Sequence, residues 1–154
     1  MFLTIHSAVG LAIGSRVSSP FIAFILGYLS HWLIDVIPHG DETLINKEKH
    51  TASKLKLIFF YFAIFDTIGI IILVYFLSSQ KIISLTTPVI FGLLGAVTPD
   101  YLWGLYKIFN LKFLKPLHQI HAWFHGLIKH KIPFKYGLVI QLTIFIILIL
   151  IIKS

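Results

Sequence analysis

The residues of this chain best suited to chemistry are histidines and aspartates at the edges of apolar segments. His31 and Asp35 stand four positions apart in "SHWLID", so on a helix their side chains share one face and can bind one ion or each other. His39 and Asp41 follow in "PHGD" and extend this polar face. The simple alternative is a paired His and Asp at a helix end. Because both groups carry a desolvation cost beside apolar sequence, we favour a functional site.

A second group of histidines has the spacing H-x-x-H-x-x-x-H, at His118, His121 and His125. On a helix these three side chains fall within an arc of about 60°. Neutral imidazoles are preferred ligands of zinc and similar divalent ions, so the row predicts a metal site. The alternative is an amphipathic helix whose histidines only touch lipid headgroups.

Two aspartates lie deep in apolar segments. Asp66, in "FAIFDTIGI", would cost at least ~2.5 kcal/mol in a membrane if isolated, so it should face a cation, an imidazole, water or a hydrogen bond from another helix. Asp100 follows Pro99, which removes a backbone donor and predicts a kinked or interrupted helix at 98–100 where water can reach. Otherwise Asp100 is the N-cap after that break.

Composition sets the class of protein that must position these residues. Of 154 residues, 57% are hydrophobic and 12% charged, which is typical of a membrane protein. Apolar runs at 21–37, 55–77, 88–106 and 136–152 approach the ~20 residues of a membrane helix, whereas the run at 2–15 is short. We expect a single all-α domain over 1–154, a polytopic bundle of about five membrane helices, with an interfacial amphipathic helix at 116–131. The chain has no cysteine, so a metal site must use His, Asp, Glu and water.

The charges predict an orientation. Alternating the spans places ten of the 13 basic residues, with all eight histidines, toward one side, which the positive-inside rule makes cytoplasmic. We therefore expect a multi-pass protein of the cytoplasmic (inner) membrane with a cytoplasmic N-terminus. The net charge of +7 comes from residues that flank apolar runs, so membrane lipids rather than nucleic acid are the expected partners.

Several short motifs together resemble a known family. "IHSAVGLAIGS", "LGYLSHWLIDVIPHGD", "GLLGAVTPD" and "LHQIHAWFH" resemble the YdjM-like family of predicted inner-membrane, metal-dependent hydrolases, and more distantly the zinc-dependent phospholipase C and P1-nuclease group. The resemblance implies ligand roles for His6, His31, Asp35 and Asp100. It departs at Leu102, where such members typically carry a second acid.

The leading hypothesis is a membrane-embedded metal-dependent hydrolase that acts on a phosphoester, in a phospholipid or a lipid-linked molecule. The ion is expected to be divalent, with zinc favoured, and a carboxylate, Asp41 or Asp66, would act as general base. The alternatives are a cation or proton transport protein and a non-catalytic protein with a structural metal site. The expected metal ligands are His6, His31, Asp35, His39, Asp100, His118, His121 and His125.

Overall fold

A computed structural model of the protein describes residues 1–43, 50–128 and 132–153. Within these residues the fold is all-α, with six α-helices, two short 3-10 helices and no strand, as predicted. Lys47 and Lys49, which are among the basic residues predicted to be cytoplasmic, lie outside the described residues, and so do the last residues of the predicted interfacial helix, 129–131. The α-helices are α1 (Leu3–Gly14), α2 (Pro20–Asp35), α3 (Ala52–Ser79), α4 (Thr87–Phe109), α5 (Lys115–His125) and α6 (Phe134–Lys153), and the 3-10 helices are η1 (Asp41–Thr43) and η3 (Lys112–Leu114).

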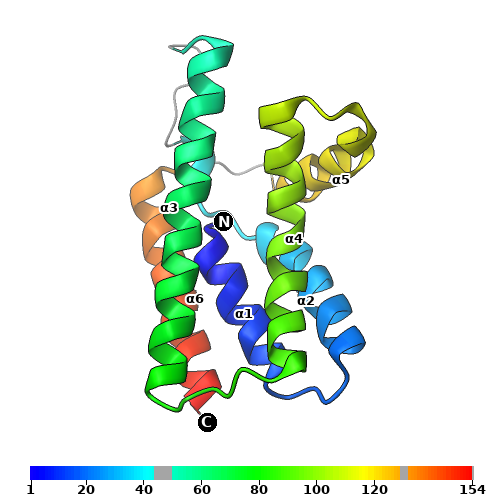
Figure 1. Cartoon of the computed structure of the whole chain (residues 1–154). Helices are drawn as coiled ribbons and strands as arrows, with labels where there is room; N and C mark the ends of the chain where they lie inside the picture. Colours follow the sequence, from blue (N-terminus) through cyan, green and yellow to red (C-terminus); the bar gives the residue numbers. More distant parts are fainter. Residues whose placement is uncertain (44–49, 129–131, 154) are drawn as a thin grey trace.

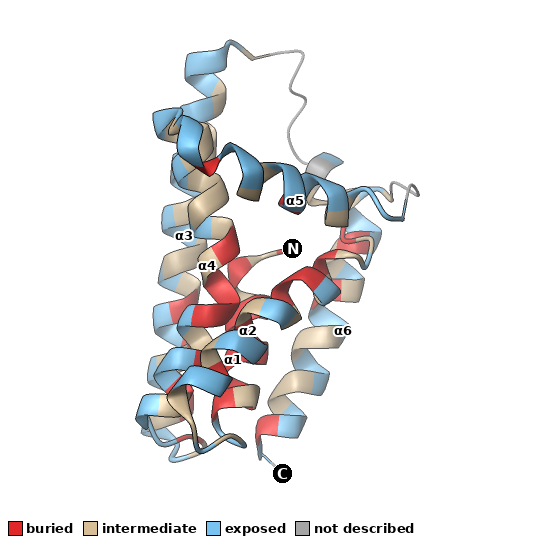
Figure 2. Ribbon diagram, turned by 90° about the vertical axis from the view of Figure 1, so that its right-hand side faces the viewer, coloured by how far each residue is buried: buried red, intermediate tan, exposed pale blue. Residues whose placement is uncertain are grey.

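Helices α1 and α2 form a short hairpin among longer helices (Figure 1). In this view α1 starts near the middle of the bundle and runs to its lower end, and α2 returns to the middle. Helices α3 and α4 extend well above both, α5 lies crosswise near the upper end, and α6 descends beside α1. The buried residues gather along α1 and the parts of α2 and α4 that face it (Figure 2).

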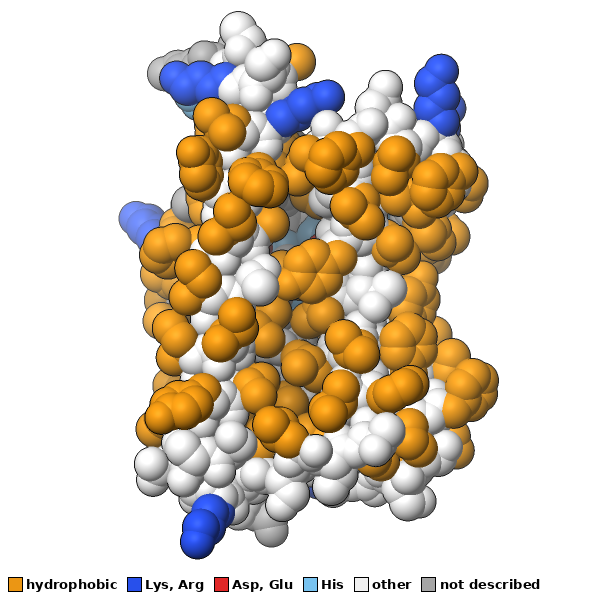
Figure 3. Space-filling model, viewed as in Figure 1, with side chains coloured by type: hydrophobic (Ala, Val, Ile, Leu, Met, Phe, Trp, Pro, Cys, Tyr) orange, Lys and Arg blue, Asp and Glu red, His pale blue; other side chains and the backbone are white. Residues whose placement is uncertain are grey.

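Three of the described helices are long and apolar enough to cross a membrane, namely α3, α4 and α6, with 28, 23 and 20 residues. Helices α1 and α2 are apolar but shorter, and the 12 residues of α1 give it a length of only about 18 Å. The face formed by α3 and α4 is covered by hydrophobic side chains (Figure 3). Phe65 on α3, for example, is 81% exposed. This surface is consistent with a membrane protein.

Helix α2 has sequence signals at both ends. Ser19 caps α2 by accepting a hydrogen bond from the Ile22 N–H, with Pro20 at the first turn, and both residue types favour these positions. The helix ends at Asp35, two residues before the end of the apolar run 21–37. Pro38 disfavours helical backbone at the residue before it, so the last turn is lost.

Helix α4 continues through Pro99, so the predicted interruption at 98–100 is wrong, and the alternative, a kink, stays a prediction. A proline removes only its own N–H from the helical ladder, and the hydrogen bonds around it can persist. The Thr98 hydroxyl donates to the Leu94 carbonyl at 2.6 Å, which adds a local bond one residue earlier. Asp100 is therefore a residue within a continuous helix and not the cap of a second one.

Glycines let α4 approach both arms of the hairpin. A Cβ atom added to Gly10 on α1 or to Gly27 on α2 would collide with the carbonyl oxygen of Gly92 on α4. Gly92 has equally little room, because its own Cβ would collide with Gly10. The three helices thus meet backbone to backbone at this level, which brings the last turn of α2 close to α4.

We expect Gly92→Ala to lower the stability of the protein by about 1–3 kcal/mol, because the added methyl group overpacks the contact with α1. Unfolding of the purified protein in detergent, followed by circular dichroism, measures this loss. Gly104→Ala on the same helix is the matched control, since a Cβ there meets nothing within 4 Å and alanine favours the helix by up to about 1 kcal/mol. Equal stability changes in the two variants would contradict the packing argument.

Candidate metal centre

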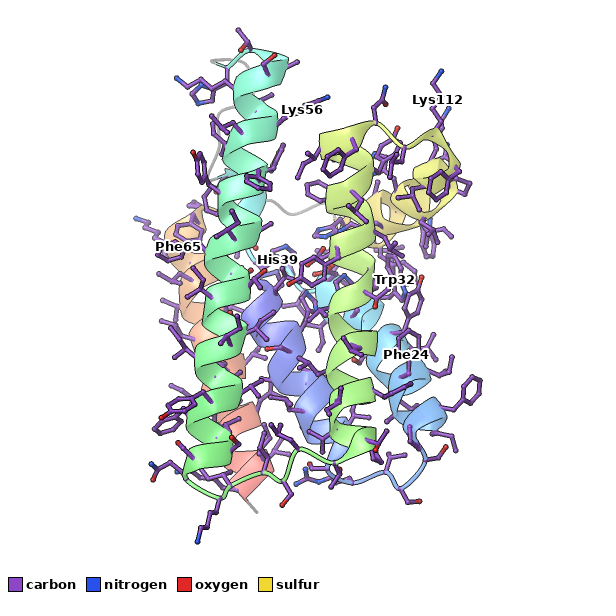
Figure 4. All side chains as sticks on the ribbon, in the orientation of Figure 1. Phe24, Trp32, His39, Lys56, Phe65 and Lys112 are labelled. Atoms are coloured by element: carbon purple, nitrogen blue, oxygen red, sulfur yellow. The ribbon has the colours of Figure 1, made fainter. Side chains whose placement is uncertain are left out.

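Most of the predicted metal ligands meet at the interior end of the short hairpin, beneath α5. Two aspartates on the long helices mark the level of the site along the bundle. Asp66 lies about 21 Å along α3 from its start at Ala52, and Asp100 about 14 Å from the end of α4 at Phe109. In Figure 4 the labelled His39 lies near this level, between α3 and α4, whereas Lys56 and Lys112 lie toward the upper end of the bundle.

The N-terminus of α1 is held in the interior by polar side chains of two long helices. Asp66 on α3 accepts hydrogen bonds from the backbone N–H groups of Leu3 and Thr4 and from the Thr4 hydroxyl. Gln141 on α6 accepts a hydrogen bond from the Phe2 N–H at 2.9 Å. The first N–H groups of a helix have no partner within the helix, so a buried start requires such acceptors.

Asp35, at the end of α2, is the centre of the site. Its side chain is fully buried, and each of its oxygens faces imidazole nitrogens. Oδ1 lies 3.1 Å from His6 Nε2, while Oδ2 lies 3.1 Å from both His31 Nε2 and His125 Nε2. His121 Nε2 lies 3.7 Å from Oδ2. Four histidines from α1, α2 and α5 thus surround one carboxylate.

His31 is oriented as a metal-binding histidine usually is. Its Nδ1–H donates to the backbone carbonyl of Ala96 at 2.8 Å, which fixes the ring and leaves Nε2 facing Asp35. Despite their short separation, neither His31 Nε2 nor Asp35 Oδ2 has a hydrogen-bond partner of acceptable geometry within the part of the chain that the structure describes. Two buried acceptor atoms without partners are costly. A cation between them would satisfy both, and a backbone bond from the second ring nitrogen is the usual support of such a ligand.

Asp100 completes a group of four possible ligands with His31, Asp35 and His121. Its Oδ1 lies 3.7 Å from His31 Nε2 and 3.6 Å from His121 Nε2. Ligand atoms in a tetrahedral zinc site with bonds of ~2.0–2.1 Å are about 3.4 Å apart. The four nitrogen–oxygen separations in this group, 3.1 to 3.7 Å, are close to that value, so the residues fit a divalent metal ion.

A second group of three possible ligands consists of Asp35, His39 and His125. The Nδ1–H of His39 donates to the Ile37 carbonyl at 2.7 Å, so its Nε2 faces the site, as in His31. Asp41 Oδ2 lies 3.9 Å from that Nε2. The nitrogen of Met1 lies against the same group, 2.8 Å from His39 Nε2 and 3.0 Å from Asp35 Oδ1.

Burial keeps His121 and His39 in the neutral form that binds metals. It lowers the pKa of His121 to about 3, against the opposing attraction of Asp35, and it also lowers the pKa of His39. The His121 ring stacks on Trp103 of α4, with centroids 5.9 Å apart. An imidazole held neutral and fixed by packing offers a lone pair to a cation.

Two of the predicted residues lie apart from these groups. His118 stacks on Tyr106 with centroids 4.6 Å apart and belongs to neither ligand group. Asp66 binds the first turn of α1 instead of the histidines. The structure brings together the other predicted ligands and the predicted base Asp41. Among these ligands, His6 belongs to neither group but contacts Asp35.

Gln141 is a site residue that the sequence analysis missed. It is buried, and its amide donates to the His39 carbonyl at 3.0 Å and to Asp41 Oδ1 at 2.7 Å while its oxygen holds Phe2. Gly137, one turn earlier on α6, allows this approach, because a Cβ there would collide with the His39 carbonyl. The sequence offered one indication of this role, which is that Gln141 is the single amide side chain in the apolar run 138–152.

Comparison of the chain with protein-family models, curated proteins and solved structures found no match.

We expect Gln141→Leu to lower the stability by about 1–3 kcal/mol, because it leaves the buried Phe2 N–H and His39 carbonyl without partners. Unfolding in detergent measures the change. Thr143→Val is the control on the same helix, since the Thr143 hydroxyl bonds only within α6, to the Val139 carbonyl. A Gln141→Leu protein as stable as the control would refute the bridging role of this amide.

Proposed function

We propose that the protein is a membrane-embedded, metal-dependent hydrolase that acts on a phosphoester carried by a lipid or lipid-linked molecule. The observation that carries this proposal is the environment of Asp35 Oδ2. Among the described residues this buried oxygen has no hydrogen-bond partner, yet it faces the Nε2 atoms of three histidines at 3.1–3.7 Å. A divalent cation is the partner that carboxylate and imidazole ligands share.

Zinc is the ion that we favour. Two imidazoles and two carboxylates at near-tetrahedral separations suit its preference for nitrogen and oxygen ligands at four positions. When bound, such an ion lowers the pKa of a coordinated water and polarises a phosphoryl oxygen. The chain must then supply a base and must bind the substrate.

Asp41 is the carboxylate best placed to act as general base. Its side chain is 23% exposed, whereas that of Asp35 is fully buried. Gln141 holds Oδ1 of Asp41, which turns Oδ2 toward His39 at the second ligand group. Asp66 has the same chemistry, but its oxygens already hold three donors of α1. We therefore assign proton transfer to Asp41.

The membrane arrangement supports a lipid substrate. We infer about five helices within the bilayer, with α1 and α2 reaching only part of the way across, and a cytoplasmic location for the end of the bundle that carries most of the lysines. Lys56 and Lys112 lie at that end (Figure 4) and would attract anionic headgroups. In this orientation the N-terminus, which lies in the interior of the bundle, faces the cytoplasmic side of an inner membrane.

Helix α5 has the exposure expected of a helix at the membrane interface. Its histidines His121 and His125 face the cluster, while Ile120 and Trp123 are 45% and 61% exposed. A helix that turns its polar residues inward and its apolar residues outward is stabilised by lipid on its outer face. A lipid-borne phosphoester would thus meet the cluster near α5.

We expect the purified protein to contain zinc and Asp35→Asn to weaken zinc binding by at least about 10-fold, because the carboxylate shared by both groups loses its charge. Elemental analysis after dialysis against a weak chelator measures the content. His118→Ala is the control, since it removes a histidine of α5 that lies outside both groups. Negligible metal in the unaltered protein would refute the metal centre.

We further expect the zinc-loaded protein to hydrolyse a phosphoester in mixed detergent and lipid micelles, and Asp41→Asn to slow this reaction about 100-fold or more by removing the base. Release of phosphate or of the alcohol is measured with soluble and lipid-borne esters. Bound zinc without hydrolysis would indicate a structural metal site. Ion flux through the protein in liposomes would indicate transport.

A further inference from the structure

We infer that the cluster holds two divalent ions that share Asp35, one in a closed four-ligand group and the other in an open three-ligand group. The inference rests on the proposed function and specifies how the site is divided. The groups are those identified above, His31, Asp35, Asp100 and His121 in one, and Asp35, His39 and His125 in the other.

The four-ligand group has the features of a closed site. It already provides the four ligand atoms that a tetrahedral zinc ion takes, which leaves no position for water or substrate. Its ligands come from the neighbouring helices α2, α4 and α5. His31 and Asp35 are fully buried, His121 is 7% exposed and Asp100 is 18% exposed. An ion here would join these three helices, with its main effect on structure.

The three-ligand group has the features of a catalytic site. Three protein ligands leave one position open, as in zinc enzymes that activate water. Its ligand His125 is 31% exposed, the most exposed side chain of either group for which the structure gives a value. Asp41, the proposed base, lies beside its ligand His39. The open position, the proposed base and the more exposed ligand therefore all belong to this group.

Asp35 is suited to be shared because one of its oxygens, Oδ2, faces a ligand of each group. Oδ2 faces His31 and His125, one ligand from each group, and Oδ1 faces His6 and the nitrogen of Met1. A carboxylate common to two ions keeps them a few ångströms apart, the separation used in two-metal phosphoester hydrolysis, about 3.5–4 Å. An ion in the second group requires the Met1 nitrogen to move off His39.

The test is the number of zinc ions bound by the full chain in detergent. We expect two ions per chain in the unaltered protein and in His118→Ala, and one in both His121→Ala and His125→Ala at a free zinc concentration that saturates the unaltered protein. Circular dichroism checks that each variant is folded. Because the unaltered chain must itself bind two ions, the inference is tested even if a variant fails to fold.

The outcomes separate this inference from the proposed function. One ion in the unaltered protein overturns the two-ion site while leaving a metal-dependent hydrolase intact, whereas no ion overturns both. If His121→Ala and His125→Ala each bind two ions, as His118→Ala does, the ions lie elsewhere. This outcome also overturns the inference.

Cobalt(II) in place of zinc tests the division into a closed and an open group. We expect the absorption spectrum of cobalt in His121→Ala, which retains the open group, to change with a midpoint near pH 7 as a bound water loses its proton. Cobalt in His125→Ala, which retains the closed group, should show no such change. The opposite assignment, or equal behaviour of the two variants, would contradict the division.

Discussion

The hydrogen bonds that receive the N-terminus of α1 are the interaction on which the rest of the structure depends. A helix that starts inside an apolar bundle presents N–H groups with no water to bind. Asp66 of α3 and Gln141 of α6 accept from Leu3, Thr4 and Phe2, and so fix the level at which α1 begins. That level is where His6 meets Asp35. The polar residues of the long helices thus allow the short helix α1 to begin inside the bundle, and the ligand cluster forms near its N-terminus.

The cluster also depends on the close approach of α2 to α4. Because Gly27 and Gly92 bring the two backbones together, the His31 ring reaches the Ala96 carbonyl of the neighbouring helix. This bond selects the nitrogen that faces Asp35. His39 reaches a carbonyl of its own loop to the same effect. Backbone packing, and not another side chain, therefore sets which atoms the site offers to a cation.

The sequence predicted the all-α fold and the polar grouping, because helical spacing and the segregation of His and Asp along the chain are properties of local pattern. Spacing placed His31 beside Asp35, and alternation of helices brought Asp100 and His121 to the same end. Pattern showed that the run at 2–15 is short but not that α1 begins inside the bundle, since the N–H acceptors that allow this come from distant helices. Nor could it separate His118 from His121, because the ring contact with Tyr106 arises only from the placement of α5 on α4. The ligand roles themselves remain predictions.

The bond between Phe2 and Gln141 joins residues 139 positions apart, and this has a consequence for how the protein is made. During synthesis the first helix emerges long before the last one exists. Until α6 is in place, the loop that carries His39 and Asp41 lacks the amide that binds it. The order of translation thus delays completion of the cluster to the final helix, so a chain truncated before α6 would lack a finished site.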